Sequence, residues 1–589
     1  MPQEPTEPDS PIDHRGRAEA ELTLARTALD ADEADGAARH LAQALAWSPA
    51  LPEVHELLAR LGARTRGGLN LYPMEGEVFV GALAARAHLL AAAGYHADAL
   101  DLLVLAQRHA PAEPWADVAW LTDPELTDRI PAERLAIQLM TLVRTLPDPI
   151  PEPARPPFLP YLNLVRRALV GAPGQPVLLW VGSSLARRLG ASEEAIDWAR
   201  RSERSEPSPQ AAVALGYAYR NLGNWREAES ALHRAVRYDP DDLDLRVDVA
   251  ELYARTDRLE EAESWLEQVL AKNQAHPSGF PTACAVRFLR TRHVDHLVAL
   301  ADHLRANPGS AHAEALLASY ARTRYWLGPV PHPDEAIVNL LDKLLASEQP
   351  LVAGRVSLSA LEPPSAVLAF NRALPDFEVD VESVPAPDLR EPLRPVEFAL
   401  WRYEGMRALP AVPEPDQATI DTVAALAGRD WRHPLSGYDE AVRLAGLDLP
   451  ELLGVLVHPC PPPDPTLGWP VWIRRLQAWT CLGILHYRTD EPWLLSTRRQ
   501  VLFDLVEGVE DWTGEAALFA LIAYAWVDPE ARSDVRALVE RRMRAAADAY
   551  AEREVTLLDS LTRLVLATPG VDERLAHFAQ ELFQRRRAR

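Results

Sequence analysis

Residues 209–242 read PQAAVALGYAYRNLGNWREAESALHRAVRYDPDD. Small residues stand at Gly216, Ala228 and Ala235 of this stretch, and small side chains let two helices approach closely. Between the two apolar patterns Gly223 interrupts the first helix. The stretch therefore predicts two short helices that pack against each other as a hairpin.

This pattern recurs with a period of 34 residues along residues 175–276. The positions that repeat after 34 residues are Gly182, Gly216 and Ala250, Tyr219 and Tyr253, Ala228 and Ala262, and Leu232 and Leu266. A fixed period of this length with small residues in register is typical of stacked helix–turn–helix units. On these residues the chain resembles the tetratricopeptide repeat (TPR) family, most closely over 209–242. The resemblance implies an α-solenoid whose surface binds another protein.

The resemblance extends less tightly to both sides of the central repeats. We expect residues 1–16 to be a disordered tail, because they are rich in proline and acid and lack periodicity. Residues 17–145 carry small residues at repeat positions and are predicted to form degenerate TPR-like helices. Residues 146–160, LPDPIPEPARPPFLP, predict an extended proline-rich linker. A TPR array is then expected over 161–347.

The pattern changes at about residue 348. Residues 355–361, 366–370 and 377–384 alternate in polarity or are rich in β-branched residues, which predicts strands. We therefore expect a small antiparallel β insertion with a loop over 348–396. From residue 397 to 589 the periodicity is helical again and predicts nine helices between residues 416 and 586, in a C-terminal α-helical domain.

The predicted fold class is thus mainly α: a TPR-type α-solenoid, a small antiparallel β element and a HEAT-like or irregular C-terminal helical block. The chain has 589 residues, 48% of them apolar, which is enough for a large core. Its formal net charge of −24 disfavours nucleic acid and acidic membranes as partners. No apolar stretch is long enough to span a bilayer, and the N-terminus lacks a signal peptide pattern. We expect a cytoplasmic protein, and the very low lysine content is typical of GC-rich bacterial coding.

No motif for a nucleotide, a dinucleotide or a serine nucleophile is present, so no cofactor and no catalytic residue is predicted. His293, His296 and His303 share part of a helical face, but their spacing separates the third side chain from the first two. A second set of potential metal ligands lacks the short Cys-x-x-Cys arm of a zinc site; its members are His458, Cys460, Cys481 and His486. No metal site is therefore predicted.

In the TPR family the first helix of each repeat lines a concave groove. Carried onto this sequence by the resemblance, the groove positions predicted to bind peptide are Arg187, Val213, Tyr217, Arg220, Asn221 and Arg255. Three arginines along one wall of an acidic chain suit a peptide with carboxylates, because guanidinium binds carboxylate in a bidentate fork. The alternative is that these arginines pair internally with carboxylates of the neighbouring helix.

The sequence thus favours a non-enzymatic scaffold or adaptor that binds a protein or peptide partner, with an acidic peptide as the favoured ligand. One alternative is a regulatory sensor, with a ligand pocket in the C-terminal helical domain near Trp401, Trp431 or Trp472. Another is an enzyme with an unrecognised site in 348–589. The oligomeric state is left open by the sequence.

Overall fold

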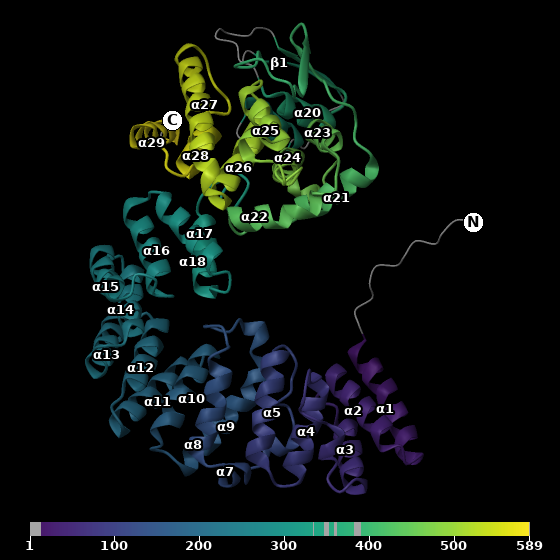
Figure 1. The fold of residues 1–589 in the computed structure, drawn as a ribbon, viewed down its shortest axis with the longest axis vertical. Helices are drawn as coiled ribbons and strands as arrows, with labels where there is room; N and C mark the ends of the chain where they lie inside the picture. The colour runs from purple at the N-terminus through teal and green to yellow at the C-terminus, as the bar shows by residue number, and fades with distance from the viewer. Residues whose placement is uncertain (1–12, 334, 347–352, 359–361, 382–389, 588–589) are drawn as a thin grey trace. The chain divides into compact units, whose positions relative to one another are not determined.

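The computed structural model describes residues 13–333, 335–346, 353–358, 362–381 and 390–587. The chain folds into two compact units, residues 1–257 and residues 258–589. The described part is mainly α-helical, with two small two-stranded sheets. Each unit is described separately below, and Figure 1 traces their elements.

Unit 1 is made of helices, which are named here in the order in which they occur along the chain. Its helices are α1 (His14–Asp30), α2 (Ala34–Trp47), α3 (Pro52–Arg64), α4 (Val80–Ala92), α5 (His96–His109), α6 (Ala119–Thr122), α7 (Leu126–Arg129), α8 (Ala132–Val143), α9 (Leu159–Gly171), α10 (Pro176–Arg188), α11 (Ser192–Ser205), α12 (Pro209–Asn221), α13 (Trp225–Tyr238) and α14 (Leu243–Arg255). Consecutive helices pair as hairpins: α1 with α2, α4 with α5, α10 with α11, and α12 with α13. The hairpins then pack on one another, with α11 and α10 both against α12.

The small residues of the repeat are the close-packing positions. Ala228 and Ala235 on α13 have no exposed surface, and Gly216 on α12 is buried. A Cβ atom added at Gly216 would lie 2.8 Å from the side chain of Leu232, which is itself buried. Helix α12 ends at a turn in which Gly223 has φ of 75°, a conformation that favours glycine. The predicted helical hairpin and its buried small residues are confirmed.

Two predicted boundaries in this unit need correction. Helix α1 begins at His14, because the Asp13 carboxylate accepts a hydrogen bond from the Gly16 amide and caps the helix. The rest of the predicted tail, residues 1–12, lies outside the described residues. The proline-rich stretch 146–160 is not a free linker but a packed loop of unit 1. It contains short 3₁₀ turns, and its apolar side chains Ile150 and Phe158 are buried.

Unit 2 also consists mainly of helices. They are α15 (Leu259–Lys272), α16 (Gly279–Thr291), α17 (Asp295–Ala306), α18 (Ala311–Ala321), α19 (Ala336–Leu345), α20 (Pro364–Ala373), α21 (Gln417–Ala427), α22 (Pro434–Ala441), α23 (Leu449–Val457), α24 (Trp469–Ile484), α25 (Thr497–Glu507), α26 (Trp512–Val527), α27 (Arg532–Glu552), α28 (Leu558–Ala567) and α29 (Glu573–Arg587). Helices α21–α29 correspond to the nine helices predicted between residues 416 and 586.

Helix α26 is the centre of this unit. It is apolar on every side and nearly all of its residues are buried. It packs against α17, α20, α22, α24, α25, α27 and α28, which surround it in the upper part of Figure 1. A helix that is hydrophobic all round belongs to the interior of a globular domain, whereas a solenoid helix contacts only its neighbours. The C-terminal block is therefore the irregular alternative and not a HEAT-like stack.

The core of unit 2 also includes part of the region predicted as a repeat array. Helices α16, α17 and α18 contribute Phe288, Leu297 and Leu317 to the same hydrophobic cluster as α24 and α26. Trp326, which follows α18, stacks on Phe519 of α26 with ring centroids 5.3 Å apart. The predicted array 161–347 is thus not one continuous stack: its helices up to α14 belong to unit 1, and α15–α19 belong to unit 2. The physical reason is that these later helices present large side chains to a globular core rather than small ones to a neighbouring hairpin.

The predicted antiparallel insertion is corrected in two respects. Strands β1 (Gly354–Leu358) and β2 (Phe377–Val381) pair in parallel, with Gly354 opposite Phe377. Residues 366–370, predicted as a strand, lie in helix α20, which begins at Pro364. Parallel strands need a crossover connection, and α20 supplies it. Residues 348–352, 359–361 and 382–389 of the predicted insertion lie outside the described residues.

The antiparallel pair lies further along the chain. Strands β3 (Trp401–Glu404) and β4 (Arg407–Pro410) form a short hairpin that the sequence analysis did not predict. Gly405 in its turn has φ of 61°, which is the left-handed conformation that tight hairpin turns require.

Candidate peptide-binding face

Helix α12 has one buried and one accessible face. The Ser208 hydroxyl caps its first turn by accepting from the Ala211 amide, and Pro209 occupies the first helical position. The buried face consists of Ala211, Ala212, Ala214, Leu215, Gly216, Ala218 and Tyr219. The other face carries the predicted groove residues: Val213, Tyr217 and Arg220 are half-buried and Asn221 is exposed.

Arg187 on α10 does not lie open to a peptide. Its side chain is only 2% exposed and forms an ion pair with Asp148, in the loop between α8 and α9. Burial of Asp148 opposes its ionisation, but the hydrogen bond and charge of Arg187 prevail and lower the pKa of Asp148. Arg187 therefore fastens the proline-rich loop to the repeats.

Tyr217 connects charged side chains of α10, α12 and α14. Its ring lies between two guanidinium groups, 5.1 Å from that of Arg187 and 4.2 Å from that of Arg220. The Tyr217 hydroxyl donates a hydrogen bond to Asp248 on α14. Arg220 is 3.9 Å from the carboxylate of Glu251, also on α14. Guanidinium and carboxyl groups from three helices thus meet around Tyr217.

The surroundings of Tyr217 raise the pKa values of both Tyr217 and Asp248. Burial raises the pKa of Tyr217 well above its usual value, with the neighbouring carboxylate of Asp248 adding to the effect. Burial is also the main cause that raises the pKa of Asp248 to about 7. The pair is consequently held as a neutral phenol and a carboxyl group that titrates near neutral pH.

The structure corrects the hypothesis of a free arginine ladder. Arg187 and Arg220 are paired with carboxylates of unit 1, which is the alternative that the sequence left open. Arg255, at the end of α14, and Asn221, at the end of α12, are exposed. The side chains of the predicted site that are accessible to a ligand are therefore the half-buried Val213, Tyr217 and Arg220 together with Asn221 and Arg255.

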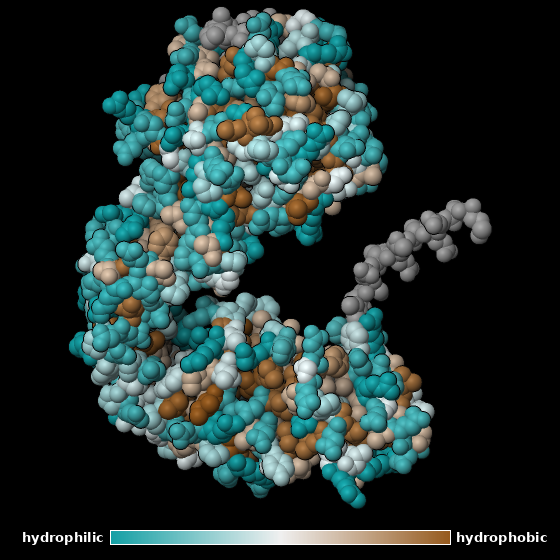
Figure 2. Space-filling view, viewed as in Figure 1, coloured by the Kyte–Doolittle hydropathy of each residue, from teal (hydrophilic) through white to brown (hydrophobic). Residues whose placement is uncertain are grey.

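A second concave feature of unit 1 was not predicted. A cavity of about 570 Å³ lies between α3, α4 and the segment before α6, with His55, His88 and Trp120 among its lining residues. The rings of His55 and His88 are 4.2 Å apart, and the Trp120 indole donates a 3.0 Å hydrogen bond to His88 Nδ1. Figure 2 shows that apolar residues also gather on the visible face over α4 and α5.

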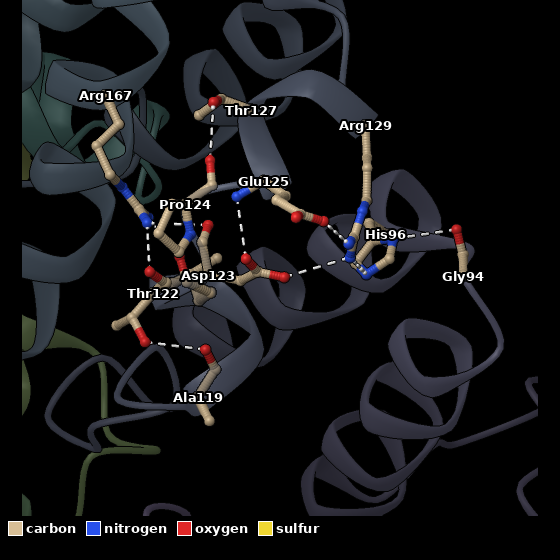
Figure 3. Close-up of polar contacts among 11 residues, drawn as sticks. Gly94, His96, Ala119, Thr122, Asp123, Pro124, Glu125, Thr127, Arg129 and Arg167 are labelled. Atoms are coloured by element: carbon tan, nitrogen blue, oxygen red, sulfur yellow. Dashed lines mark hydrogen bonds and ion pairs between the residues drawn. The ribbon is translucent and has the colours of Figure 1, made fainter.

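Polar contacts hold residues 122–125, which directly follow the cavity-lining residues 117–120. Figure 3 shows Arg129 directed at Asp123 and Glu125, at distances of 3.3 and 2.6 Å. Arg167 on α9 donates to the Thr122 carbonyl at 2.6 Å. These arginines bind backbone and side-chain oxygens of one short connector and are therefore engaged within unit 1. Burial lowers the pKa of both His55 and His88, which keeps the imidazoles neutral.

The structure also bears on the other possibilities considered from the sequence: a metal site, a sensor pocket and a membrane-spanning helix. Within the described residues no group of three or more His, Cys, Asp or Glu side chains could hold a metal ion. Trp401, Trp431 and Trp472, the residues suggested for a sensor pocket, are buried core residues. Trp401 lines a cavity of only about 60 Å³, which is too small for an organic ligand. In the part of the chain that the structure describes, no helix combines the length and hydropathy needed to cross a membrane.

Buried carboxylates do converge in unit 2, around Arg474 on α24. Its guanidinium lies 3.4 Å from Glu335, and it also pairs with Glu515 on α26. The Trp512 indole donates to Glu335 at 2.7 Å. The adjoining cavity, lined by Glu515, measures only about 20 Å³, which is room for about one water molecule. This cluster is a packed ionic network with no space for a substrate.

Comparisons with known proteins agree with this architecture. A family model described as tetratricopeptide repeat matches residues 193–279, which include α12 and α13. No curated protein matches the chain.

Among solved structures, three illustrate the likeness. A thermophilic TPR protein from Thermus thermophilus is 23% identical, with a TM-score of 0.26 over 32% of this chain and 96% of its own. YrrB, described as a TPR protein with an unusual peptide-binding site, is 17% identical, with a TM-score of 0.24 over 33% of this chain and 95% of its own. A tetratricopeptide repeat protein from Parabacteroides merdae is 15% identical, with a TM-score of 0.27 over 51% of this chain and 98% of its own.

Proposed function

Since residues 193–279 match a tetratricopeptide repeat model, we propose that the chain is a non-enzymatic scaffold that binds an extended segment of a partner protein on unit 1. Repeat folds expose a continuous surface on one side of stacked helices and commonly serve recognition. The observation that carries the proposal is the face of α12 opposite its core, where Val213, Tyr217 and Arg220 are half-buried and Asn221 is exposed, while the other face is buried.

The favoured ligand is an acidic peptide. Arg255 supplies an exposed guanidinium at the end of α14, and Asn221 supplies an exposed amide at the end of α12. Arginine binds carboxylates more strongly than a neutral donor does, because the hydrogen bond is charge-assisted. Tyr217 supplies an aromatic surface for an apolar side chain of the peptide, and its hydrogen bond to Asp248 fixes the ring.

The test compares labelled twelve-residue peptides that differ only in whether they carry Glu or Gln, titrated against the full chain. We expect the acidic peptide to bind more tightly, and Arg255→Glu to weaken it about tenfold or more. The matched control is Arg237→Glu, which reverses an exposed charge on α13, the outer helix of the hairpin, and should leave binding unchanged. Equal affinity of wild type and Arg255→Glu for the acidic peptide would exclude this site.

Arg220→Glu is a less specific variant. It also removes the ion pair with Glu251 and the contact with the Tyr217 ring, so reduced binding by that variant alone does not locate the ligand.

A further inference from the structure

Unit 2 contains a cavity of about 780 Å³, which lies in the size range of small-molecule sites, roughly 300–1,000 Å³. It is formed by four separate segments: the junction of α16 and α17, the end of α18, helix α28, and helix α29 with the turn before it. Neither the repeat match nor the proposed peptide-binding face involves these residues.

The side chains that line this cavity carry positive charge, whereas the chain as a whole is acidic. Three arginines line it, Arg292, Arg324 and Arg563, and no Asp or Glu belongs to its lining among the described residues. The formal net charge of the whole chain is −24. A concentration of guanidinium groups in an acidic protein marks a place where an anion is attracted.

Two of the three guanidinium groups lack a carboxylate partner within the described parts of the chain. Arg563 pairs with Asp559 at 3.0 Å, whereas Arg324 donates to the Arg292 carbonyl at 2.9 Å and lies over the Phe288 ring. Burial, and then the charge of Arg292, lower the pKa of Arg324, as expected where positive charge is not compensated. The two histidines of the lining, His293 and His577, each have a carboxylate neighbour at the rim.

Arg292 is also unusual in its backbone. It ends α16 with φ of 61°, a left-handed conformation at a position where helices usually have glycine. Arg66 and Arg488 have a positive φ as well, so the conformation is not peculiar to this position; what places Arg292 at the site is its exposed side chain in the lining of the cavity.

Aromatic side chains provide the other half of the site. The Arg563 guanidinium lies 3.4 Å from the ring centroid of Tyr325 and 4.6 Å from that of Phe583. Leu566 and Val571 complete an apolar wall. The lining of the cavity therefore offers aromatic surface for a flat apolar group and guanidinium groups for an anionic group.

We propose that this cavity binds a small organic anion that joins a phosphate or carboxylate head to an aromatic body. The head group lies between Arg292 and Arg324, and the body packs on Tyr325 and Phe583. This inference is independent of the peptide-binding face, which belongs to unit 1.

The test uses isothermal titration of the full chain with 2-naphthyl phosphate and with 2-naphthoate, which distinguish the two head groups, and with uncharged 2-naphthol. We expect saturable binding of at least one of the anions and none of 2-naphthol. Arg292→Gln and Arg324→Gln should each weaken that binding about tenfold, the loss expected for one charged hydrogen bond. The matched control is Arg322→Gln, an exposed arginine on the same segment that does not line the cavity, and it should bind as wild type does.

Three results would overturn the proposal: no saturable binding of either anion up to about 5 mM, binding of 2-naphthol as tight as that of the anions, or equal losses in Arg292→Gln and Arg322→Gln. Because the Arg292 side chain is exposed, its variant should keep the fold, and circular dichroism verifies this for each variant.

Discussion

The Tyr217 hydroxyl on α12 donates its hydrogen bond to the carboxyl group of Asp248, which lies on α14. The same tyrosine ring lies beside the guanidinium of Arg220. A residue that the repeat pattern assigns to ligand contact is thus also a link between successive repeats. Its position depends on a group whose pKa is near neutral pH.

Asp248→Asn should make the stability of unit 1 less dependent on pH. Burial raises the pKa of Asp248 from 3.8 to about 7, so the folded state binds this proton more tightly than the unfolded chain does. Stability therefore falls as pH rises from about 4 through about 7. We expect the variant to match wild type near pH 4 and to exceed it by roughly 1–3 kcal/mol at pH 8. Scanning calorimetry at both pH values measures this, and a variant that is less stable at both would contradict it.

The ion pair of Arg187 with Asp148 should contribute strongly to the stability of unit 1. Arg187 is buried, and Arg187→Met leaves the Asp148 carboxylate without its partner, which costs about 3 kcal/mol. Asp148→Asn in the same chain should recover part of that loss, because no unpaired charge then remains. Urea denaturation of the single and double variants gives the coupling energy, and a coupling near zero would mean that the pair is replaced by solvent.

Gly216→Val tests the close packing of the central hairpin. A Cβ atom at this position would lie 2.8 Å from the Leu232 side chain, so we expect a loss of about 2–3 kcal/mol in the free energy of unfolding. Gly171→Val is the matched control, because Gly171 is exposed at the end of α9 and no atom lies within 4 Å of its added Cβ. Comparable losses for the two variants would show that helix propensity, rather than packing, sets the cost.

The features that could be predicted from sequence are those with a local, periodic cause. Gly216, Ala228 and Ala235 are buried because a hairpin of this period needs small residues there, and helices α21–α29 follow from the spacing of their apolar residues. The short apolar run 366–370 is compatible with either a strand or a buried helix. Pro364 at the first helical position is the signal that favours a helix.

The candidate site could be predicted only in part, because it depends on contacts between residues that are far apart in the sequence. The partner of Arg187 is Asp148, 39 residues earlier in a proline-rich loop that has no periodic pattern. The arginine-lined cavity of unit 2 is formed by four segments, of which α16 and α29 are almost 300 residues apart along the chain. No local pattern indicates which arginines keep a carboxylate neighbour after folding and which do not.

Glu362→Gln should stabilise unit 2 at alkaline pH and leave unit 1 unchanged. Glu362, which precedes α20, is 3% exposed; burial and the charge of Glu335 raise its pKa to about 8, compared with 4.5 as the usual value. The folded state therefore retains this proton between about pH 4.5 and 8, and stability declines as pH rises through that window. Glutamine keeps the shape without the charge, so we expect near equality at pH 5 and a gain of roughly 3 kcal/mol at pH 9.

Scanning calorimetry is the suitable measurement, because two compact units can unfold in separate transitions. Glu391→Gln removes an exposed carboxylate of the same unit and should shift neither transition at either pH. Asp248→Asn provides the complementary control, since its effect should be confined to the transition of unit 1. If Glu362→Gln destabilised unit 2 equally at pH 5 and pH 9, the carboxyl group would have to be ionised at both pH values and held by a partner, and its raised pKa would be wrong.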